Sequence, residues 1–331
     1  MNFKRTIPVS FLVIFLISLF VVSVCASEYQ LRWGSGNSKE HPWSIVSEKI
    51  IKDIYEETDG RIEIDIYYGG ALGSEAEMLE MLRAGSLDIL TSGPLILSSF
   101  FDPVQIFSLP YLFDDRDHAR ETFKEDFIEE WFNDIILSKS NVRTIAYWYL
   151  GTRTLTTSNI PAEKPEDLKG VKIRCMDFPI SKDVVGALGA TPTPIPFVEL
   201  YMSLQTGVVE GQENPIMNIY DMKFYEVQDY LIYTNHNTHM GSVHVSDFTW
   251  QKISEKDREI ILNIFEKNNQ LIYDLIDELD EKYVKEMIEK GMKVIEPDID
   301  AFMKHGREYI WERYKDKYGE YILQINPNFT D

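Results

Sequence analysis

Cysteine is nearly absent from this sequence. The 331 residues include two cysteines, Cys25 and Cys175. Cys25 falls at the end of an N-terminal segment that we expect to be removed, which leaves Cys175 unpaired and excludes an intramolecular disulfide. The fold must therefore be stabilised by apolar burial, and a chain of this length is expected to form two domains with sizeable cores.

Positive charge is also scarce. The sequence has 33 Lys and Arg against 54 Asp and Glu, so its formal net charge is -21 at pH 7. Such a surface repels nucleic acid and anionic lipid headgroups, and we expect neither as a partner. An anion could be bound only in a pocket that supplies its own well-placed cations, against the field of the whole molecule.

The common motifs of hydrolytic and phosphate-binding enzymes are missing. The sequence has no Gly-x-Ser-x-Gly turn, no His-Glu-x-x-His pair and no phosphate loop. Because no nucleophile–base pair can be assigned, we expect no enzymatic activity; an extracytoplasmic hydrolase is the alternative. His236, His239 and His244 stand in an extended stretch without the cysteines or paired carboxylates that complete a metal site, so we expect neither metal nor cofactor.

Only one long hydrophobic run is present, at the N-terminus. Lys4 and Arg5 precede a nearly all-apolar stretch from 7 to 24, and Val24-Cys25-Ala26 offers a small-residue cleavage site. This pattern predicts that residues 1–26 are a secretory signal peptide and that the mature protein is periplasmic. A membrane anchor is the alternative, because 18 residues can just span a bilayer.

The stretch 27–150 alternates between strand and helix patterns. Apolar residues at 62, 64 and 66 alternate with charged ones, whereas residues 43–57 carry a helical stripe. Ser74 and Glu77 form a capping box that opens a helix ending at Gly85. With short strands at 31–34 and 87–91, this order predicts an α/β sheet. A helix over 115–137 and a strand over 142–149 are expected to follow.

A second α/β unit begins near Gly151. Its expected elements are strands at 171–174 and 243–248 and helices at 181–188, 196–205, 256–290 and 299–318. The pattern over 256–290 would form a helix about 50 Å long, which exceeds a small domain and predicts a helix crossing both lobes. We expect lobe I to comprise 27–150 and about 240–279, and lobe II 151–239 and about 280–331, with a hinged ligand cleft between them.

A cationic side chain, Arg174, and an amide side chain, Asn214, lie near the two ends of the stretch 171–215. Arg174 ends a strand, which is where open α/β sheets bind their ligands. Asn214 precedes Pro215, so its backbone should be extended and its side chain should lie at the start of a helix. No nucleophile accompanies them, and the stretch is suited to hold a small anion. The alternatives are an ion pair of Arg174 with a surface acid such as Asp177 and a helix-capping role for Asn214.

The stretch 171–234 resembles the solute receptors of tripartite ATP-independent periplasmic (TRAP) transporters, in their dicarboxylate-receptor-like branch. The matching segments are Lys172-Ile173-Arg174, Gly189-Ala190-Thr191-Pro192, Pro196-Phe197-Val198-Glu199-Leu200-Tyr201, 204–215 (LQTGVVEGQENP) and Phe224-Tyr225-Glu226-Val227, with 70–75 (GALGSE), Gly85-Ser86-Leu87-Asp88 and 109–113 (LPYLF) in the first lobe. The resemblance covers essentially the whole mature chain, and it implies a two-lobed fold like that of type II periplasmic binding proteins.

The resemblance also implies roles for individual residues. In this family an arginine at the position of Arg174 forms a salt bridge with the ligand carboxylate. A guanidinium suits that role because its planar fork matches a carboxylate and keeps its charge. Arg153 is implied to lie near the pocket, as a second donor or as a hinge-side charge. Asn214 is implied to hydrogen-bond the ligand carboxylate or a nearby hydroxyl.

Candidates from the first lobe rest on its loops. The resemblance implies that the loop 36–43 lines the pocket, and its possible contacts are Asn37, His41 and Trp43. Ser92 follows another predicted strand. The sequence there, Ser92-Gly93-Pro94, lacks the carboxylate that some acid-sugar receptors carry, which disfavours an amino-sugar or sialic-acid ligand.

Two aromatic candidates have structural alternatives. Trp148 could form an apolar or stacking wall of the pocket, or it could pack in the core. Tyr201 falls with Phe197, Leu200 and Leu204 at the spacing of a buried helical stripe, although it could reach the cleft.

Together these observations predict a monomeric periplasmic receptor that binds a small organic acid and hands it to the membrane permease of a TRAP transporter. The ligand is expected to be a sugar acid such as a uronate or a C4-dicarboxylate, and the polar loop 36–41 with the aromatics near Trp148 favours a hydroxylated sugar acid. A sensor protein of the same fold is the alternative. Once ligand binds, closure would follow from contacts made only in the closed state.

Overall fold

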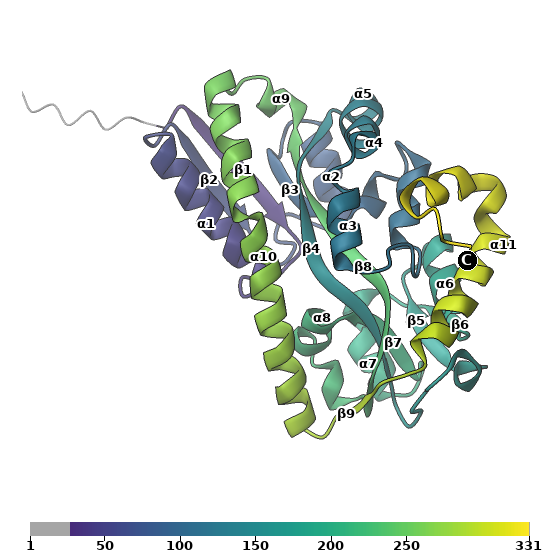
Figure 1. Ribbon diagram of the computed structural model, residues 1–331. Coiled ribbons are helices and arrows are strands. Elements are labelled where there is room, and N and C mark those ends of the chain that lie inside the picture. The colour runs from purple at the N-terminus through teal and green to yellow at the C-terminus, as the bar shows by residue number, and fades with distance from the viewer. Residues whose placement is uncertain (1–26, 331) are drawn as a thin grey trace, which may run out of the picture.

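The computed structural model describes residues 27–330, so the predicted signal peptide lies outside the described residues. The strands are β1 (Tyr29–Ser35), β2 (Ile62–Tyr67), β3 (Ile89–Ser92), β4 (Val142–Thr157), β5 (Lys172–Cys175), β6 (Thr191–Pro194), β7 (Gly211–Pro215), β8 (Tyr230–Ser246) and β9 (Lys293–Ile295). They form one sheet in the order β2-β1-β3-β8-β4-β7-β5-β6, and β9 pairs with β8 (Figure 1).

Helices flank this sheet along its whole length. The α-helices are α1 (Pro42–Glu57), α2 (Glu75–Arg83), α3 (Arg116–Thr122), α4 (Asp126–Glu129), α5 (Leu137–Ser140), α6 (Pro179–Ala187), α7 (Leu200–Gln205), α8 (Ile216–Asp221), α9 (Asp247–Trp250), α10 (Glu255–Glu289) and α11 (Ile299–Ile325). The short 3-10 and π turns are η3 (Pro94–Leu97), η4 (Asp102–Ser108), η5 (Glu130–Ile136), η6 (Pro165–Leu168), η7 (Phe197–Glu199) and η8 (Phe224–Glu226).

The sheet has a parallel region at each end and an antiparallel centre. β1 pairs in parallel with β2 and β3, and β5 pairs in parallel with β6 and β7. Between them β4 and β8 pair antiparallel from Val142 opposite Ser246 to Thr157 opposite Tyr230. We call the half of the molecule around β1–β3 the first lobe and the half around β5–β7 the second lobe. The α/β architecture predicted from the sequence is confirmed, with β4 and β8 shared between the lobes.

The crossing strands bend where the lobes meet. The register between β4 and β8 shifts between Tyr149 and Gly151, and again between Arg153 and Leu155. Gly151 has φ of 108°, in the region that favours glycine, and a Cβ there would lie 3.4 Å from Cβ of Pro215. The bend therefore depends on a residue without a side chain.

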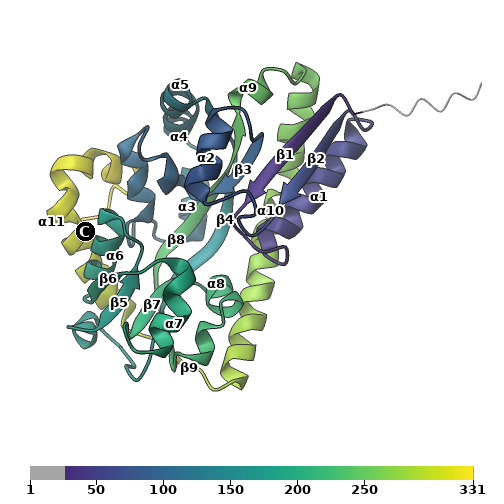
Figure 2. The same cartoon turned by 180° about the vertical axis from the view of Figure 1, so that it is seen from behind.

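Helix α10 confirms the predicted long helix. It has 35 residues and begins at Ser254, whose side chain accepts a hydrogen bond from the Asp257 amide. It packs against α1 in the first lobe and α8 in the second, and it runs beside β4 between them. Figures 1 and 2 show the same helix along both lobes from opposite sides. A single rigid element thus spans the point at which the strands bend.

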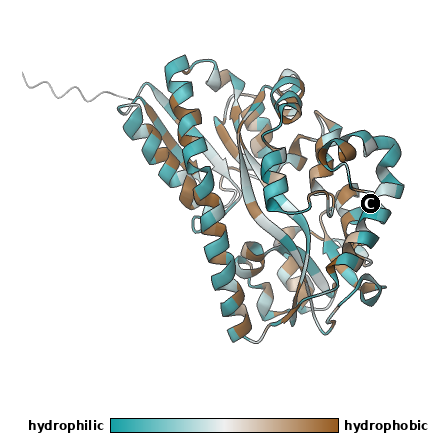
Figure 3. Ribbon diagram, viewed as in Figure 1, coloured by the Kyte–Doolittle hydropathy of each residue, from teal (hydrophilic) through white to brown (hydrophobic). Residues whose placement is uncertain are grey.

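Apolar side chains form one large core and two smaller ones. The large core lies in the first lobe and includes Trp33, Ile50 and Trp148, all fully buried. The smaller cores lie in the second lobe, around Ile173 and around Leu200. Helices such as α1 and α10 accordingly show hydrophobic bands between hydrophilic ones (Figure 3).

The last helix contacts both lobes. Phe302 of α11 belongs to the second-lobe core around Ile173, whereas Ile322 belongs to the large first-lobe core. The Tyr318 hydroxyl donates to Asp102 at 2.6 Å, which ties the same half of the helix to the first lobe. The prediction from the sequence assigns about 280–331 to the second lobe. The periodicity of this segment carries no information on which lobe the helix packs against.

The helix-like stretch predicted over about 115–137 is helical but is not one continuous α-helix. The chain forms α3, α4, η5 and α5 in this region, with a break after Thr122. Phe123 leaves the helical path, and its ring packs 4.8 Å from that of Phe107 and 4.9 Å from that of Tyr147 (centroid distances). Tertiary packing of an aromatic side chain thus overrides the local helical pattern.

Candidate functional site

Arg174 is buried without a carboxylate partner. It lies at the end of β5 and is 3% exposed. Its Nε donates to the Ile195 carbonyl at 2.9 Å, and its Cζ lies 5.6 Å from the centroid of the Phe197 ring. Asp177, the surface acid considered above, pairs instead with Lys182 Nζ at 2.9 Å. Within residues 27–330 no acid lies within ion-pair distance of Arg174, so its terminal nitrogens are available to a ligand.

The environment of Arg174 makes its charge costly. Burial lowers the pKa of the guanidinium, and only the attraction of Glu213 opposes this to a notable extent. An arginine nevertheless keeps its proton at any physiological pH. A buried cation without a partner gains most from an anion that enters the site.

Arg153, by contrast, is committed to a partner inside the protein. Its Nε and Nη2 bind the two carboxylate oxygens of Glu213 at 2.5 and 2.9 Å, and Nη2 also donates to the Glu213 carbonyl at 2.7 Å. The His236 ring Nε2 lies 3.1 Å from the same carboxylate. Burial alone would raise the pKa of Glu213, but Arg153 and His236 outweigh it and hold the pKa at about 2. The charge of Arg153 is therefore neutralised locally.

Asn214 is fixed by this buried pair. It lies in β7 opposite Thr154 of β4 and is 3% exposed. Its Oδ1 accepts from Arg153 Nη2 and from Asn218 Nδ2, each at 3.3 Å, and its Nδ2 donates to Gln212 at 2.5 Å. Pro215, not Asn214, is the N-cap of α8, and no side-chain hydrogen bond caps that helix. The structure therefore does not show the capping alternative.

A cavity of about 390 Å³ lies between the two lobes beside these residues. Its walls are Gly36, Asn37, Ser38, Glu40 and His41 from the loop after β1 and Phe197, Asn218, Asp221 and Met222 from the second lobe. Phe197 connects the cavity to Arg174, and Asn218 connects it to Asn214. Of the predicted residues, Asn37 and His41 thus line the cavity, and Arg174 and Asn214 lie behind its wall, next to Phe197 and Asn218.

His41 presents an unsatisfied ring nitrogen. Its Nδ1 accepts a hydrogen bond from the Trp43 amide at 3.1 Å, which caps α1. Burial lowers the pKa of His41 to about 3, so the ring is neutral and carries its proton on Nε2. Nε2 is buried and has no hydrogen-bond partner within the described chain.

The two tryptophan candidates pack in the first-lobe core. Trp43 is 3% exposed, and its Nε1 donates to the Tyr149 carbonyl at 2.7 Å. Trp148 is fully buried, with its ring about 6 Å from those of Trp33, Trp43 and Phe265. These placements favour the packing alternative stated for Trp148.

Ser92 and Tyr201 lie apart from the cavity walls. Ser92 ends β3 and is 1% exposed, with its hydroxyl 3.4 Å from the Gly93 carbonyl. Tyr201 packs beside the second-lobe core around Leu200, and its hydroxyl donates to Glu226 at 3.0 Å. This placement of Tyr201 agrees with its position in the helical stripe.

Several residues of the site were missed from the sequence. Asp221 belongs to no recognisable sequence motif. Asn218 follows the predicted residue Asn214 by four positions, a spacing that places two side chains on one face of a helix, so the sequence could have indicated it. Of the other hollows, one of about 590 Å³ lies over α11 at Met303 and Trp311, away from Arg174.

Two lobes joined by the long strands β4 and β8, with a cavity between them near a buried arginine that has no acidic partner in the described chain, are typical of a solute-binding protein. The family model "Bacterial extracellular solute-binding protein, family 7" matches residues 33–317. The chain therefore belongs to this family, and it is a periplasmic solute-binding protein of the TRAP type, not an enzyme.

Relatives match over most of their length. The sialic acid-binding periplasmic protein of Vibrio cholerae is 34% identical over 278 residues, which cover 84% of this chain and 86% of the relative. The 2,3-diketo-L-gulonate-binding periplasmic protein of Escherichia coli is 28% identical over 86% of this chain and 85% of its own.

Solved structures agree in fold. The TRAP solute-binding protein of Chromohalobacter salexigens with bound D-glucuronate superposes with a TM-score of 0.83 at 25% identity, covering 91% of this chain and 99% of its own. That of Polaromonas sp. JS666 with bound D-erythronate gives 0.81 at 26% identity, covering 89% and 97%. The two-lobed fold predicted from the sequence is thus confirmed.

The described residues show neither a membrane-spanning helix nor a cluster of metal ligands. No helix between residues 27 and 330 is both long and apolar enough to cross a membrane. Over the same range, no group of three or more His, Cys, Asp or Glu is arranged to hold a metal ion. His236 is engaged with Glu213, and His244 with Thr144 and Ser242.

Proposed function

We propose that this protein captures a small organic acid, either a sugar acid such as a uronate or a C4-dicarboxylate, and delivers it to the permease of a TRAP transporter. The observation that carries the proposal is Arg174, a buried guanidinium whose terminal nitrogens have no partner in the described chain. A ligand carboxylate would satisfy both the charge and the hydrogen-bonding capacity of this group.

The ligands of similar proteins support this chemistry. Structures of comparable chains contain D-glucuronate, D-erythronate and, in Roseobacter denitrificans at 28% identity, L-galactonate. A relative from Bacillus subtilis, 27% identical, is a C4-dicarboxylate-binding protein. All of these ligands carry a carboxylate, which is the group that Arg174 is suited to bind.

Ligand contact is proposed for the residues around the cavity. Arg174 would anchor the carboxylate, and Asn214, which the Arg153–Glu213 pair holds in place, would donate or accept beside it. Asn37 and His41 would contact the remainder of the ligand from the first lobe. For Trp43, Trp148 and Tyr201 the observed packing supports a role in supporting the site.

Closure of the lobes would complete the site. The crossing strands bend at Gly151 beside α10, and residues of both lobes line the cavity. A ligand that contacts both walls binds the closed state more tightly than the open state and so stabilises the closed state by that difference in binding free energy. The permease would recognise the closed state. Lobe boundaries near 150, 240 and 280 remain the prediction from the sequence, and the C-terminal half of α11 packs on the first lobe.

Calorimetric titration tests the proposal. A panel of uronates, aldonates and C4-dicarboxylates is titrated into the wild type and into Arg174→Ala and Arg174→Lys. We expect Arg174→Ala to lose about 100-fold or more in affinity, because a buried charged partner is removed, and Arg174→Lys to retain part of it.

The matched control is Arg143→Ala, which removes a half-buried arginine paired with Asp247 at 2.9 Å in the first lobe. It should leave ligand affinity unchanged. Unchanged affinity in Arg174→Ala would instead remove Arg174 from the site, and binding of none of the acids would refute the ligand class.

A further inference from the structure

We propose that Glu40 and Asp221 are specificity-determining residues that exclude a second carboxylate, so that the ligand is a hydroxylated monocarboxylic acid and not a dicarboxylate. This inference rests on the proposed function, since it decides between the two ligand classes stated there. Its basis is the distribution of charge over the walls of the cleft.

The two carboxylates face the same cavity from opposite lobes. Glu40 belongs to the loop after β1, and Asp221 is the last residue of α8. Both side chains keep contact with solvent and line the cavity of about 390 Å³. Neither forms an ion pair with any residue that the structure describes; the neighbouring Lys39 pairs with Glu48 at 3.4 Å.

The carboxylates interact across this gap. Desolvation raises the pKa of Asp221, and repulsion by Glu40 raises it further. The repulsion acts between the lobes, so it opposes closure unless the ligand places hydrogen-bond donors between the two groups. Carboxylates only accept hydrogen bonds when ionised, and hydroxyl groups supply the donors that they lack.

Around the cavity, residues 27–330 offer a ligand one positive charge without an internal partner. Arg174 is free, whereas Arg153 is neutralised by Glu213. His41 is neutral, and no described lysine or arginine lines the cavity. A ligand with one carboxylate on Arg174 is matched in charge, but a second carboxylate would find no cation.

The path from Arg174 into the cavity passes the Phe197 ring. That ring lies beneath the guanidinium and also forms part of the cavity wall. A carboxylate bound to Arg174 therefore directs the rest of the ligand towards Glu40 and Asp221. A terminal hydroxyl can donate to them, whereas a terminal carboxylate adds a third negative charge, and like charges placed together weaken binding strongly.

Matched ligand pairs isolate this effect. D-Erythronate and meso-tartrate share four carbons and their stereocentres and differ in having a hydroxymethyl group or a carboxylate at one end. L-Galactonate and galactarate form the corresponding six-carbon pair. Each acid is titrated by calorimetry at pH 7.5 into the wild type and into the double variant Glu40→Gln, Asp221→Asn.

The wild type should bind the monoacid of a pair about tenfold or more tightly than the diacid. In the double variant this ratio should fall by about tenfold, because diacid binding becomes stronger. The control is Glu57→Gln, Asp65→Asn, which removes two negative charges from exposed positions of α1 and β2 that do not line the cavity. It should leave the ratio unchanged.

Three results would overturn the inference. Equal affinity of the wild type for both members of a pair refutes the selection against a second carboxylate but leaves the receptor function intact. A ratio that falls equally in both double variants assigns the effect to net charge and not to the cleft. If the wild type binds neither member of either pair, the ligand class fails together with this inference.

Discussion

At the scale of single residues, two buried arginines of this protein have opposite situations. Arg153 is held by Glu213 and His236, whereas Arg174 has no acidic partner in the described chain. The sequence identified both as candidates, but it could not distinguish them. Glu213 is 60 positions from Arg153 in the sequence, and only the pairing of β4 with β7 brings them together. Ion-pair partners that are so far apart in the sequence produce no recognisable local sequence pattern.

The Arg153–Glu213 pair should matter for stability. Glu213→Gln leaves a buried guanidinium without its counter-charge, and we expect a loss of about 3–5 kcal/mol in the free energy of unfolding at pH 7. Because the folded pKa of Glu213 is depressed to about 2, its contribution is present above the unfolded pKa of about 4.5 and is lost as the pH falls towards 2.

Urea unfolding at several pH values measures this dependence. The difference between wild type and Glu213→Gln should shrink between about pH 4.5 and 2. Glu57→Gln, at an exposed position, serves as control and should change stability by less than about 0.5 kcal/mol. A variant as stable as the wild type at pH 7 would contradict the account of the pair.

At the scale of elements, local patterns predicted the first lobe well. The alternation at 62–66, the capping box at Ser74 and the long helix α10 are all found in the structure. The predicted strand 142–149 is part of β4, and the predicted strand 243–248 overlaps the end of β8, which stops at Ser246 before α9; β4 and β8 have 16 and 17 residues. The polar part of β8 from Thr234 to Thr238 is buried except for Asn235, so it lacks the apolar alternation that marks a strand.

Helix α10 meets the bend of β4 at Asp280. A Cβ on Gly151 would lie 3.7 Å from Asp280 Oδ2, and Oδ1 is buried without a hydrogen-bond partner in the described residues. Burial raises the pKa of Asp280 to about 7, with a smaller contribution from Asp277. A carboxyl whose pKa is raised on folding contributes to the stability of the folded protein while the pH is below its unfolded pKa. That contribution is lost as the pH rises through about 7.

We therefore predict that Asp280→Asn is more stable than the wild type at pH 8, by about 1–3 kcal/mol. The difference should decrease as the pH falls from 7 and should vanish below about 4, where the wild-type carboxyl is protonated in both states. Thermal or urea unfolding over this range measures it. The control is Asp274→Asn, at an exposed position of the same helix; equal pH profiles of Asp280→Asn and wild type would refute the prediction.

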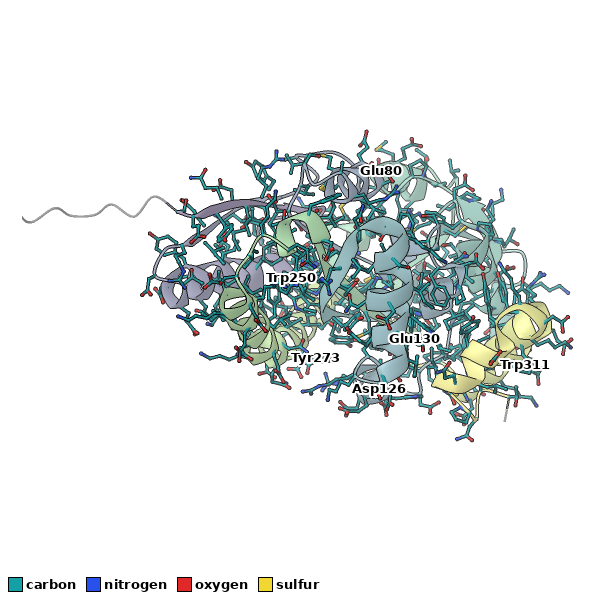
Figure 4. The ribbon with its side chains drawn as sticks, turned by 90° about the horizontal axis from the view of Figure 1, so that it is seen from above. Glu80, Asp126, Glu130, Trp250, Tyr273 and Trp311 are labelled. Carbon is teal, nitrogen blue, oxygen red and sulfur yellow. The ribbon has the colours of Figure 1, made fainter. Side chains whose placement is uncertain are left out.

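At the scale of the whole molecule, the fold class and the receptor class followed from the sequence, but the arrangement of the lobes did not. α11 contacts both lobes, and the cleft combines a loop after β1 with η7 and α8. Such contacts depend on tertiary packing, which the periodicity of a segment does not report. Seen from above, the acidic side chains Glu80, Asp126 and Glu130 come from three different elements, α2, α4 and η5 (Figure 4).

We propose that this acidic molecule binds an anion through one local cation. With a net charge of -21, the surface opposes the approach of an organic acid, so affinity must come from the short-range contacts of Arg174. Glu40 and Asp221 line the same cavity, and we propose that they face the uncharged end of the ligand.

The most direct test is a crystal structure of the protein with the acid that binds most tightly in the titrations. We predict that the two carboxylate oxygens of the ligand lie about 2.7–2.9 Å from the terminal nitrogens of Arg174, between the two lobes. A ligand whose carboxylate is bound elsewhere, with Arg174 left without an anionic partner, would contradict the central claim.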